Sequence, residues 1–203
     1  MSRVEREAEQ RFCAAGTAVC RKGEPVDAWI GVLEGLVKIH AVSADGRSVT
    51  FTGIPAGGWF GEGSLLKADP RKYDALALRD SRIARMPRAT FEWLIDNSIG
   101  FNRFLLRQLN ERLAQFIALV EYERLLDTDA RVARCLGELF NPVLYPGIGP
   151  RLSISQEEIG YLTGVSRQRV NQALQRLERE GLLTVGYGGV EVLDVDKLRS
   201  YGA

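Results

Sequence analysis

The clearest alternation of hydrophobic and polar residues lies in the last quarter of the chain. Apolar residues recur at the i, i+3, i+4 and i+7 spacing of one helix face over residues 170–177. Ser155 followed three residues later by Glu158 forms a capping box, which predicts the start of an earlier helix. Residues 163–165 contain a glycine that permits a sharp turn, and Ser166 is suited to cap the second helix. The pattern therefore predicts two short helices joined by a tight turn.

The polar face of the predicted second helix carries side chains that can read DNA bases. Arginine donates two hydrogen bonds to guanine, and glutamine or asparagine can pair with adenine. Two apolar runs at 182–185 and 190–193, joined by a glycine-rich turn, predict the wing of a winged helix-turn-helix. The alternative is an ordinary helical domain that happens to contain capped helices, but it does not explain why cap, turn, polar face and wing occur in this order. The candidate base-reading residues are Arg167, Gln168, Asn171 and Gln172.

The first half of the chain has a different period. Short β-type runs separated by glycine-containing turns indicate an antiparallel barrel or jelly roll. These runs are 17–20, 29–33, 35–42, 48–52, 75–78 and 82–86. Such rolls also house metalloenzymes, whose metal needs two or three histidines and a carboxylate, and the sequence has only His40. It has no nucleophile elbow or phosphate-binding loop either. We therefore expect neither an enzyme nor a metal site.

After Pro87 the period becomes helical again, with a short helix predicted at 90–96 and a long one at about 98–126. Apolar residues in the long helix are spaced three, four, three and four, which is the pattern of a seam between two helices. A helix-turn-helix usually reads two half-sites as a dimer, so we interpret the seam as a homodimer interface. The alternative is that the seam covers its own domain. The seam residues are Leu106, Leu109, Leu113, Phe116 and Val120.

Composition and charge narrow this picture only slightly. The 203 residues carry a formal net charge of +1, so any positive surface for nucleic acid must be local. Three cysteines do not build a disulfide framework, although a redox pair of Cys13 and Cys20 stays open. No apolar run approaches the roughly 20 residues that span a bilayer, so we expect a cytoplasmic protein with no membrane partner. We expect three parts: 1–96, 97–126 and 127–203.

Two sequence motifs, together with the order of the parts, resemble the bacterial Crp/Fnr superfamily of transcription regulators, whose founding member responds to cyclic AMP. The resemblance covers nearly the whole chain. It implies an α+β fold: an N-terminal antiparallel β-roll like a cyclic-nucleotide-binding jelly roll, a long dimerisation helix and a C-terminal winged helix-turn-helix. The motifs are Leu126-Asp127-x-x-x-Arg131 and Ile154-(x4)-Ile159-Gly160-(x3)-Gly164-Val165-Ser166-Arg167-(x2)-Val170.

The resemblance also implies partners and contacts. It implies a homodimer on a palindromic double-stranded DNA operator, with RNA polymerase as a further partner. It places base contacts on Arg167, Gln168 and Gln172. We expect Ser155, Ser166 and Arg169 on phosphates, where they position the protein without specifying sequence.

For an effector, the resemblance places the phosphate cassette of cyclic-nucleotide binders at residues 58–66. Gly61 and Glu62 then match its glycine and glutamate, whereas Lys72 and Tyr73 stand where binders have an arginine and a serine or threonine. Lysine lacks the bidentate fork of arginine, and tyrosine is bulky enough to fill the pocket. Phe116 and Ile117 replace two hydroxyls that contact adenine, and neither donates a hydrogen bond.

These departures predict a regulator that cyclic AMP does not control. They leave either an unknown small-molecule effector or a pocket filled by its own side chains. No cofactor is identified, because three scattered cysteines do not supply the four thiolates of an iron–sulfur sensor. The alternatives are a cyclic-nucleotide-responsive regulator, a regulator controlled by its own abundance, and a ligand-binding module whose winged helix contacts protein.

Overall fold

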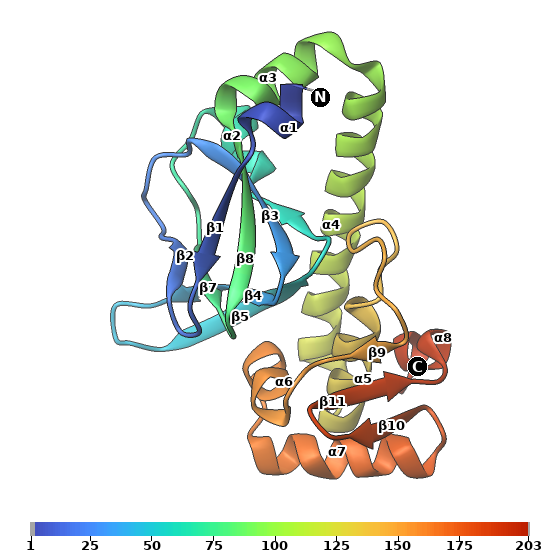
Figure 1. The fold of residues 1–203 in the computed structure, drawn as a ribbon. Helices are drawn as coiled ribbons and strands as arrows, with labels where there is room; N and C mark the ends of the chain where they lie inside the picture. Colours follow the sequence, from blue (N-terminus) through green and yellow to red (C-terminus); the bar gives the residue numbers. More distant parts are fainter. Residues whose placement is uncertain (1–2, 203) are drawn as a thin grey trace. The chain divides into compact units, whose positions relative to one another are not determined.

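The computed structural model describes residues 3–202 (Figure 1). The chain divides into two compact units, Met1–Arg112 and Leu113–Ala203. The boundary falls inside the long helix α4 (Ile99–Leu125), so each unit contains part of that helix. Among the described residues, no helix is both long and apolar enough to cross a membrane.

The first unit contains two four-stranded antiparallel sheets, which confirms the predicted β-roll (Figure 1). One sheet has the order β1-β8-β3-β6 and the other the order β2-β7-β4-β5. The strands are β1 (Glu9–Cys13), β2 (Ala18–Cys20), β3 (Ala28–Glu34), β4 (Leu36–Val42), β5 (Ser48–Pro55), β6 (Trp59–Phe60), β7 (Asp74–Ala77) and β8 (Ser81–Pro87).

A single glycine joins β3 to β4, at one of the turns expected from the sequence. Gly35 has a φ of 99°, a left-handed conformation that glycine adopts without steric cost. A Cβ at this position would lie 2.8 Å from the Cα of Ser81. The Ser81 hydroxyl also accepts a hydrogen bond from the backbone N–H of Leu36, at 3.3 Å. The turn therefore brings β4 close to the start of β8.

An aromatic cluster fills the core of the first unit beside its helices. Trp29 is 2% exposed, and its ring lies 4.5 Å from Trp59, 5.5 Å from Phe91 and 5.8 Å from Phe101, centroid to centroid. Leu105 of α4 belongs to the same buried cluster. The other helices of this unit are α1 (Arg3–Glu7), α2 (Glu62–Lys67) and α3 (Arg88–Asn97).

Helix α4 leaves most of the predicted seam at the surface of the chain. Leu106, Leu113 and Val120 are each more than half exposed, and Ile117 beside them is 62% exposed. The exception is Leu109, which is partly buried and packs against the aromatic cluster of the first unit. Four of the five seam residues therefore lie at the surface of the chain, and Leu109 serves its own unit.

The second unit combines helices with a small antiparallel sheet of order β10-β11-β9 (Figure 1). The hairpin of β10 and β11 confirms the predicted wing. Helix α8 follows the wing and was not expected from the sequence. The elements are α5 (Thr128–Glu138), β9 (Arg151–Leu152), α6 (Gln156–Thr163), α7 (Arg167–Arg179), β10 (Leu183–Gly186), β11 (Gly189–Val192) and α8 (Val195–Ser200).

Candidate nucleic-acid interface

The first helix of the predicted pair, α6, begins at the capping box seen in the sequence. The Ser155 hydroxyl accepts a hydrogen bond from the Glu158 backbone N–H at 3.2 Å, and the Glu158 carboxylate accepts from the Ser155 N–H at 2.6 Å. Each side chain thus satisfies a backbone donor that the helix itself leaves unpaired. These two hydrogen bonds therefore define the residue at which α6 begins.

Two glycines shape the turn between α6 and α7. Gly164 ends α6 in the left-handed region, with a φ of 66°. Gly160 allows a close approach instead, because a Cβ there would lie 2.7 Å from the backbone oxygen of Val165. The sequence predicted the role of Gly164 but not that of Gly160, because this close contact appears only when the turn is folded.

Helix α5 supports the same turn. Asp127 caps α5 by accepting a hydrogen bond from the Ala130 N–H at 2.9 Å. One helical turn later, the Arg131 guanidinium donates from Nη2 to the backbone oxygen of Thr163 at 2.7 Å. This contact satisfies a carbonyl at the C-terminal end of α6. The motif of Asp127 and Arg131 therefore builds the framework of the helix-turn-helix and contributes no base-reading group.

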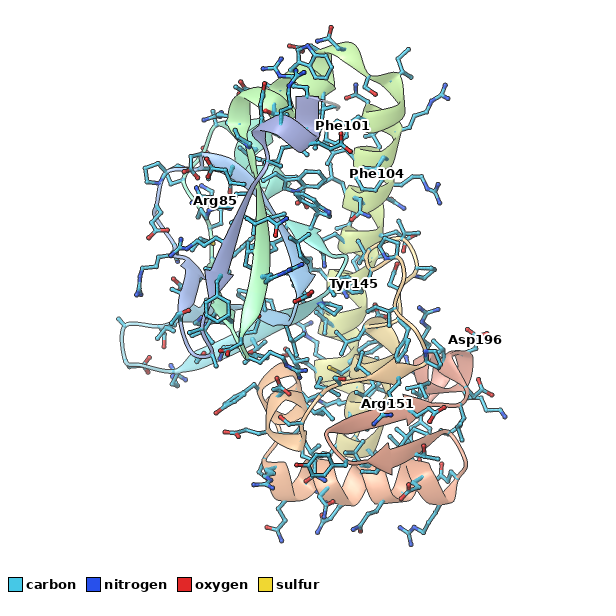
Figure 2. All side chains as sticks on the ribbon, viewed as in Figure 1. Arg85, Phe101, Phe104, Tyr145, Arg151 and Asp196 are labelled. Atoms are coloured by element: carbon cyan, nitrogen blue, oxygen red, sulfur yellow. The ribbon has the colours of Figure 1, made fainter. Side chains whose placement is uncertain are left out.

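Helix α7 separates an apolar face from a polar one, as predicted. The Ser166 hydroxyl accepts from the Arg169 N–H at 3.4 Å and caps the helix. Val170, Ala173, Leu174 and Leu177 are at most 1% exposed, which fixes the helix against its unit. Arg167, Gln168 and Gln172 are all exposed. Figure 2 shows a row of nitrogen-bearing side chains along the outer edge of α7. All four candidate base readers therefore lie on α7, and three of them are exposed.

Several polar side chains of α7 are held by other side chains of this unit. Asn171 is half-buried, and its Oδ1 accepts a hydrogen bond from Gln156 Nε2 of α6 at 3.1 Å. Arg169 Nη1 donates to Gln172 Oε1 at 2.7 Å. Arg176 forms ion pairs of 3.1 Å with Asp129 and with Glu180. Asn171 thus joins the two helices, whereas Gln172 keeps an exposed amide.

A pocket with a volume of about 280 Å³ lies between the start of α6, the start of α7 and the wing. Ser155 and Gln156 line one side, Arg167 another, and the glycines of the wing a third. Tyr187 at the tip of the wing is fully exposed. Ser155, Ser166 and Arg169, the residues expected on phosphates, are all exposed as well. The sequence-predicted DNA contacts are therefore gathered on one unit of the molecule.

The cassette of the β-roll differs from the sequence prediction at one position. Arg71, not Lys72, is the buried cation: it is 4% exposed and donates from Nη2 to the Ala28 backbone oxygen at 3.0 Å. Its Nη1 lies 2.6 Å from where a Cβ on Gly61 would stand, and it has no hydrogen-bond partner among the described residues. Lys72 is exposed and pairs with Asp69 at 3.1 Å. The assignment of Lys72 to the effector pocket stays a prediction, and Arg71 is the cation that this segment buries.

Backbone hydrogen bonds hold the segment in which Arg71, and not Lys72, is the buried cation. The N–H of Arg71 donates to the Glu24 carbonyl at 3.0 Å, and the Arg71 carbonyl accepts from the Gly23 N–H at 2.8 Å. This pairing anchors the backbone at Arg71, and the chain bends at Lys72 and Tyr73. The Arg71 side chain is buried, whereas the Lys72 side chain is exposed. Arg71 directly precedes Lys72 in the sequence, and an arginine at this place was the signal that could have identified the buried cation.

The remaining cassette residues interact with other side chains of the β-roll. Glu62 is buried, and its carboxylate accepts a hydrogen bond from the Trp29 indole N–H at 3.2 Å. Burial raises the pKa of Tyr73 well above its ordinary value, and the nearby Glu62 carboxylate raises it further. Phe116 and Ile117 belong to the second unit, where both side chains are exposed, so their assignment to an effector pocket stays a prediction.

The β-roll followed by a winged helix defines a class: transcription regulators that join an effector-type domain to a DNA-binding one. Residues 10–98 match the cyclic nucleotide-binding domain, and residues 130–201 match the Crp-like helix-turn-helix domain. The chain is 30% identical to the transcriptional regulator SdrP of Thermus thermophilus, over 86% of this chain and 84% of that protein. It is also 30% identical to a CRP-like cAMP-activated global transcriptional regulator of Mycobacterium tuberculosis, over 90% and 83% of the two chains.

Solved structures agree with this class. TTHA1359, a CRP/FNR-family transcriptional regulator from Thermus thermophilus, is 28% identical with a TM-score of 0.63, and the match covers 95% of this chain and 97% of that one. FixK2 from Bradyrhizobium japonicum shares the fold, with a TM-score of 0.78 at 20% identity over 97% and 98% of the chains. The chain belongs to the Crp/Fnr family. It is thus a transcription regulator with a DNA-binding helix-turn-helix, and not an enzyme.

Proposed function

We propose that this chain is a homodimeric, sequence-specific DNA-binding transcription regulator that cyclic AMP does not control. The observation that carries the proposal is the exposed row of guanidinium and amide groups on α7, held in place by the capped helix-turn-helix. We also propose that it acts in the cytoplasm with RNA polymerase as a further partner, because a regulator works where transcription takes place.

Base reading falls to the exposed residues near the start of α7. Arg167 and Gln168 occupy its first turn, and Gln172 lies one turn further along. Ser155 and Ser166 flank them and supply phosphate contacts, which fix register without reading sequence; the sequence predicts the same role for Arg169.

A random duplex library, sequenced after binding, tests this function. Arg167→Ala should lose about 1 to 3 kcal/mol on the selected DNA and relax one base position. Equal weakening on random DNA would contradict base reading by Arg167. Steep salt dependence of wild-type binding separates DNA binding from the alternative in which the winged helix contacts protein, because phosphate neutralisation releases counterions.

The homodimer is proposed from the apolar surface of α4. Leu106, Leu113, Ile117 and Val120 are 51–66% exposed on one helix. A second copy of α4 would cover them and supply the two-fold axis that paired half-sites require. Leu113→Glu should give monomers in sedimentation at micromolar concentration, whereas Leu66→Glu on α2 serves as an exposed control, with Leu66 47% and Leu113 59% exposed. A monomeric wild-type protein would contradict the proposal.

The proposal of control without cyclic AMP is supported by the β-roll. The Glu62 carboxylate already accepts from Trp29, and Tyr73 adds a bulky ring. Among Glu62, Arg71 and Tyr73, it is Arg71 that carries the guanidinium donors that can bind a phosphate. The family does not fix the effector: one relative is called cAMP-activated, while the CLP protein of Xanthomonas campestris, with a TM-score of 0.63 at 25% identity, is called c-di-GMP responsive. Operator binding should be the same without nucleotide, with cyclic AMP and with cyclic GMP. Binding that appears only with a nucleotide would contradict this part of the proposal.

A further inference from the structure

Two side-chain amides on helix α7 have oxygens that already accept hydrogen bonds from other side chains. Arg169 donates to Gln172 Oε1 at 2.7 Å, within the first half of α7. Gln156 of α6 donates to Asn171 Oδ1 at 3.1 Å. In each case one lone pair of the amide oxygen faces a donor of the protein, which leaves the second lone pair and the two N–H groups of the amide for another partner. Asn171 is half-buried, so only Gln172 presents those N–H groups at the surface.

The bond from Arg169 changes what Gln172 can recognise. An unconstrained glutamine offers one acceptor and one donor side by side, the pair that matches N6 and N7 of adenine. Here a guanidinium cation lies against the acceptor. Binding adenine would bring its N6 amino group, another donor, against the same oxygen and close to that cation. The Gln172 oxygen would then accept from two donors at once, one of them a cation, which weakens the charge-assisted bond from Arg169.

Guanine has the opposite character in the major groove. Its O6 and N7 atoms both accept hydrogen bonds, and neither places a donor near the guanidinium. A glutamine that presents its N–H groups can donate to these acceptors without losing the bond from Arg169. The same glutamine therefore favours guanine when its oxygen is held, and adenine when it is not.

We propose that Arg169 is a specificity-determining positioning residue, which orients the Gln172 amide so that this position of the operator is read as guanine and not adenine. The inference rests on the proposed DNA-binding function. It gives Arg169 a role other than the phosphate contact expected from the sequence, and it reverses the base preference expected of a free glutamine.

The experiment compares bound-pool sequences for the wild type and three full-length variants. Gln172→Ala identifies the base pair that Gln172 reads, because that position alone loses its preference. At this position the wild type should favour guanine over adenine by about fivefold or more, the ratio that one good base contact provides. Arg169→Ala should shift this position towards adenine and leave the others unchanged.

Arg179→Ala is the matched control. Arg179 lies on the same helix, is exposed, and donates to the Gln175 backbone oxygen at 3.3 Å without touching a base-reading side chain. Its removal should leave the sequence preference of the wild type intact. Circular dichroism of each variant establishes that α7 is still folded.

The outcomes separate the inference from the function on which it rests. Adenine at the Gln172 position in the wild type would overturn the inference and leave the regulator function standing. An Arg169→Ala variant that binds all sequences more weakly with unchanged preference would overturn it in favour of a phosphate contact. If the wild type selects no motif, the proposed function and the inference both fail.

Discussion

The polar groups of α7 and those of the β-roll cassette use their hydrogen-bonding capacity in opposite ways. On α7, Arg167 and Gln168 are exposed, so their donors meet solvent. In the cassette, Glu62 and Arg71 are buried and bond to Trp29 and Ala28 of the neighbouring strand. A buried polar group that loses its partner costs about 1–3 kcal/mol, whereas an exposed one exchanges it for water. The first region therefore keeps its groups for an external partner, and the second mainly uses them to hold its own fold.

The largest expected effect comes from removing the buried ring of β3 that donates to Glu62 of the cassette. Trp29→Ala deletes a buried indole and leaves the Glu62 carboxylate without its donor. Loss of about 3–5 kcal/mol of unfolding free energy is expected, as for other buried aromatic residues. Urea unfolding of the full chain measures it. Trp93→Ala is the control, because that ring is 39% exposed. Similar losses in both variants would contradict the internal role of the cassette.

The DNA-binding unit should be most sensitive at its turn and less so at its exposed polar face. Gly160→Ala places a methyl group 2.7 Å from the Val165 backbone oxygen, so the backbone must shift. We expect a loss of about 1–3 kcal/mol in unfolding free energy and weaker DNA binding. Gly63→Ala in α2 is the matched control, because its Cβ would meet nothing within 4 Å. Equal stability of the two variants would show that the close approach is not required.

A smaller effect is expected at the start of α5. Asp127→Ala removes the carboxylate that accepts from the Ala130 N–H, and loss of such a cap costs about 1 kcal/mol. The free energy of unfolding in urea is the measurement. Asp196→Ala in α8 should change it by less than about 0.5 kcal/mol, because that side chain is 97% exposed. If both substitutions have the same effect, the cap does not stabilise the unit.

The smallest effect at neutral pH concerns Cys20 of the β-roll. Burial raises the pKa of this thiol from 9.0 to about 11. Between these values the unfolded chain loses the proton while the folded chain keeps it, so stability should fall as the pH rises from about 9 to 11. Below pH 9 both states keep the proton, and Cys20 adds no pH dependence. Urea midpoints of the wild type and Cys20→Ala should therefore run parallel from pH 7 to 8.5 and converge or cross above pH 9. Parallel curves up to pH 11 would contradict the shift.

A contrast between local contacts and contacts between distant segments explains which parts of the structure could be predicted from the sequence. The predicted caps at Ser155 and Ser166, like the cap at Asp127, join groups three residues apart, so a local pattern is sufficient to find such caps. The apolar face of α7 is also a local property. The order of the elements in the helix-turn-helix and its wing followed from such signals.

Contacts between distant segments were harder to predict. Strand β1 was missed because it depends on pairing with β8, as in Arg11 with Ile83. Helix α2 was missed because Gly61 begins it without a capping side chain. The burial of Arg71, rather than of Lys72, accompanies a backbone pairing with the turn at Gly23, which no local pattern reveals. The bond between Arg169 and Gln172 lies within one helical turn, but its geometry depends on side-chain rotamers.

The hydrogen bond from Arg131 to the Thr163 carbonyl has a consequence for local opening. A helix end usually frays, and its amide hydrogens then exchange quickly with solvent. Here the final turn of α6 is held by a side chain from α5, and the Thr163 hydroxyl bonds to the Ile159 carbonyl in the same turn. These bonds must break before the turn can open. Amide exchange at the end of α6 should therefore follow the joint opening of α5 and α6, as one cooperative unit.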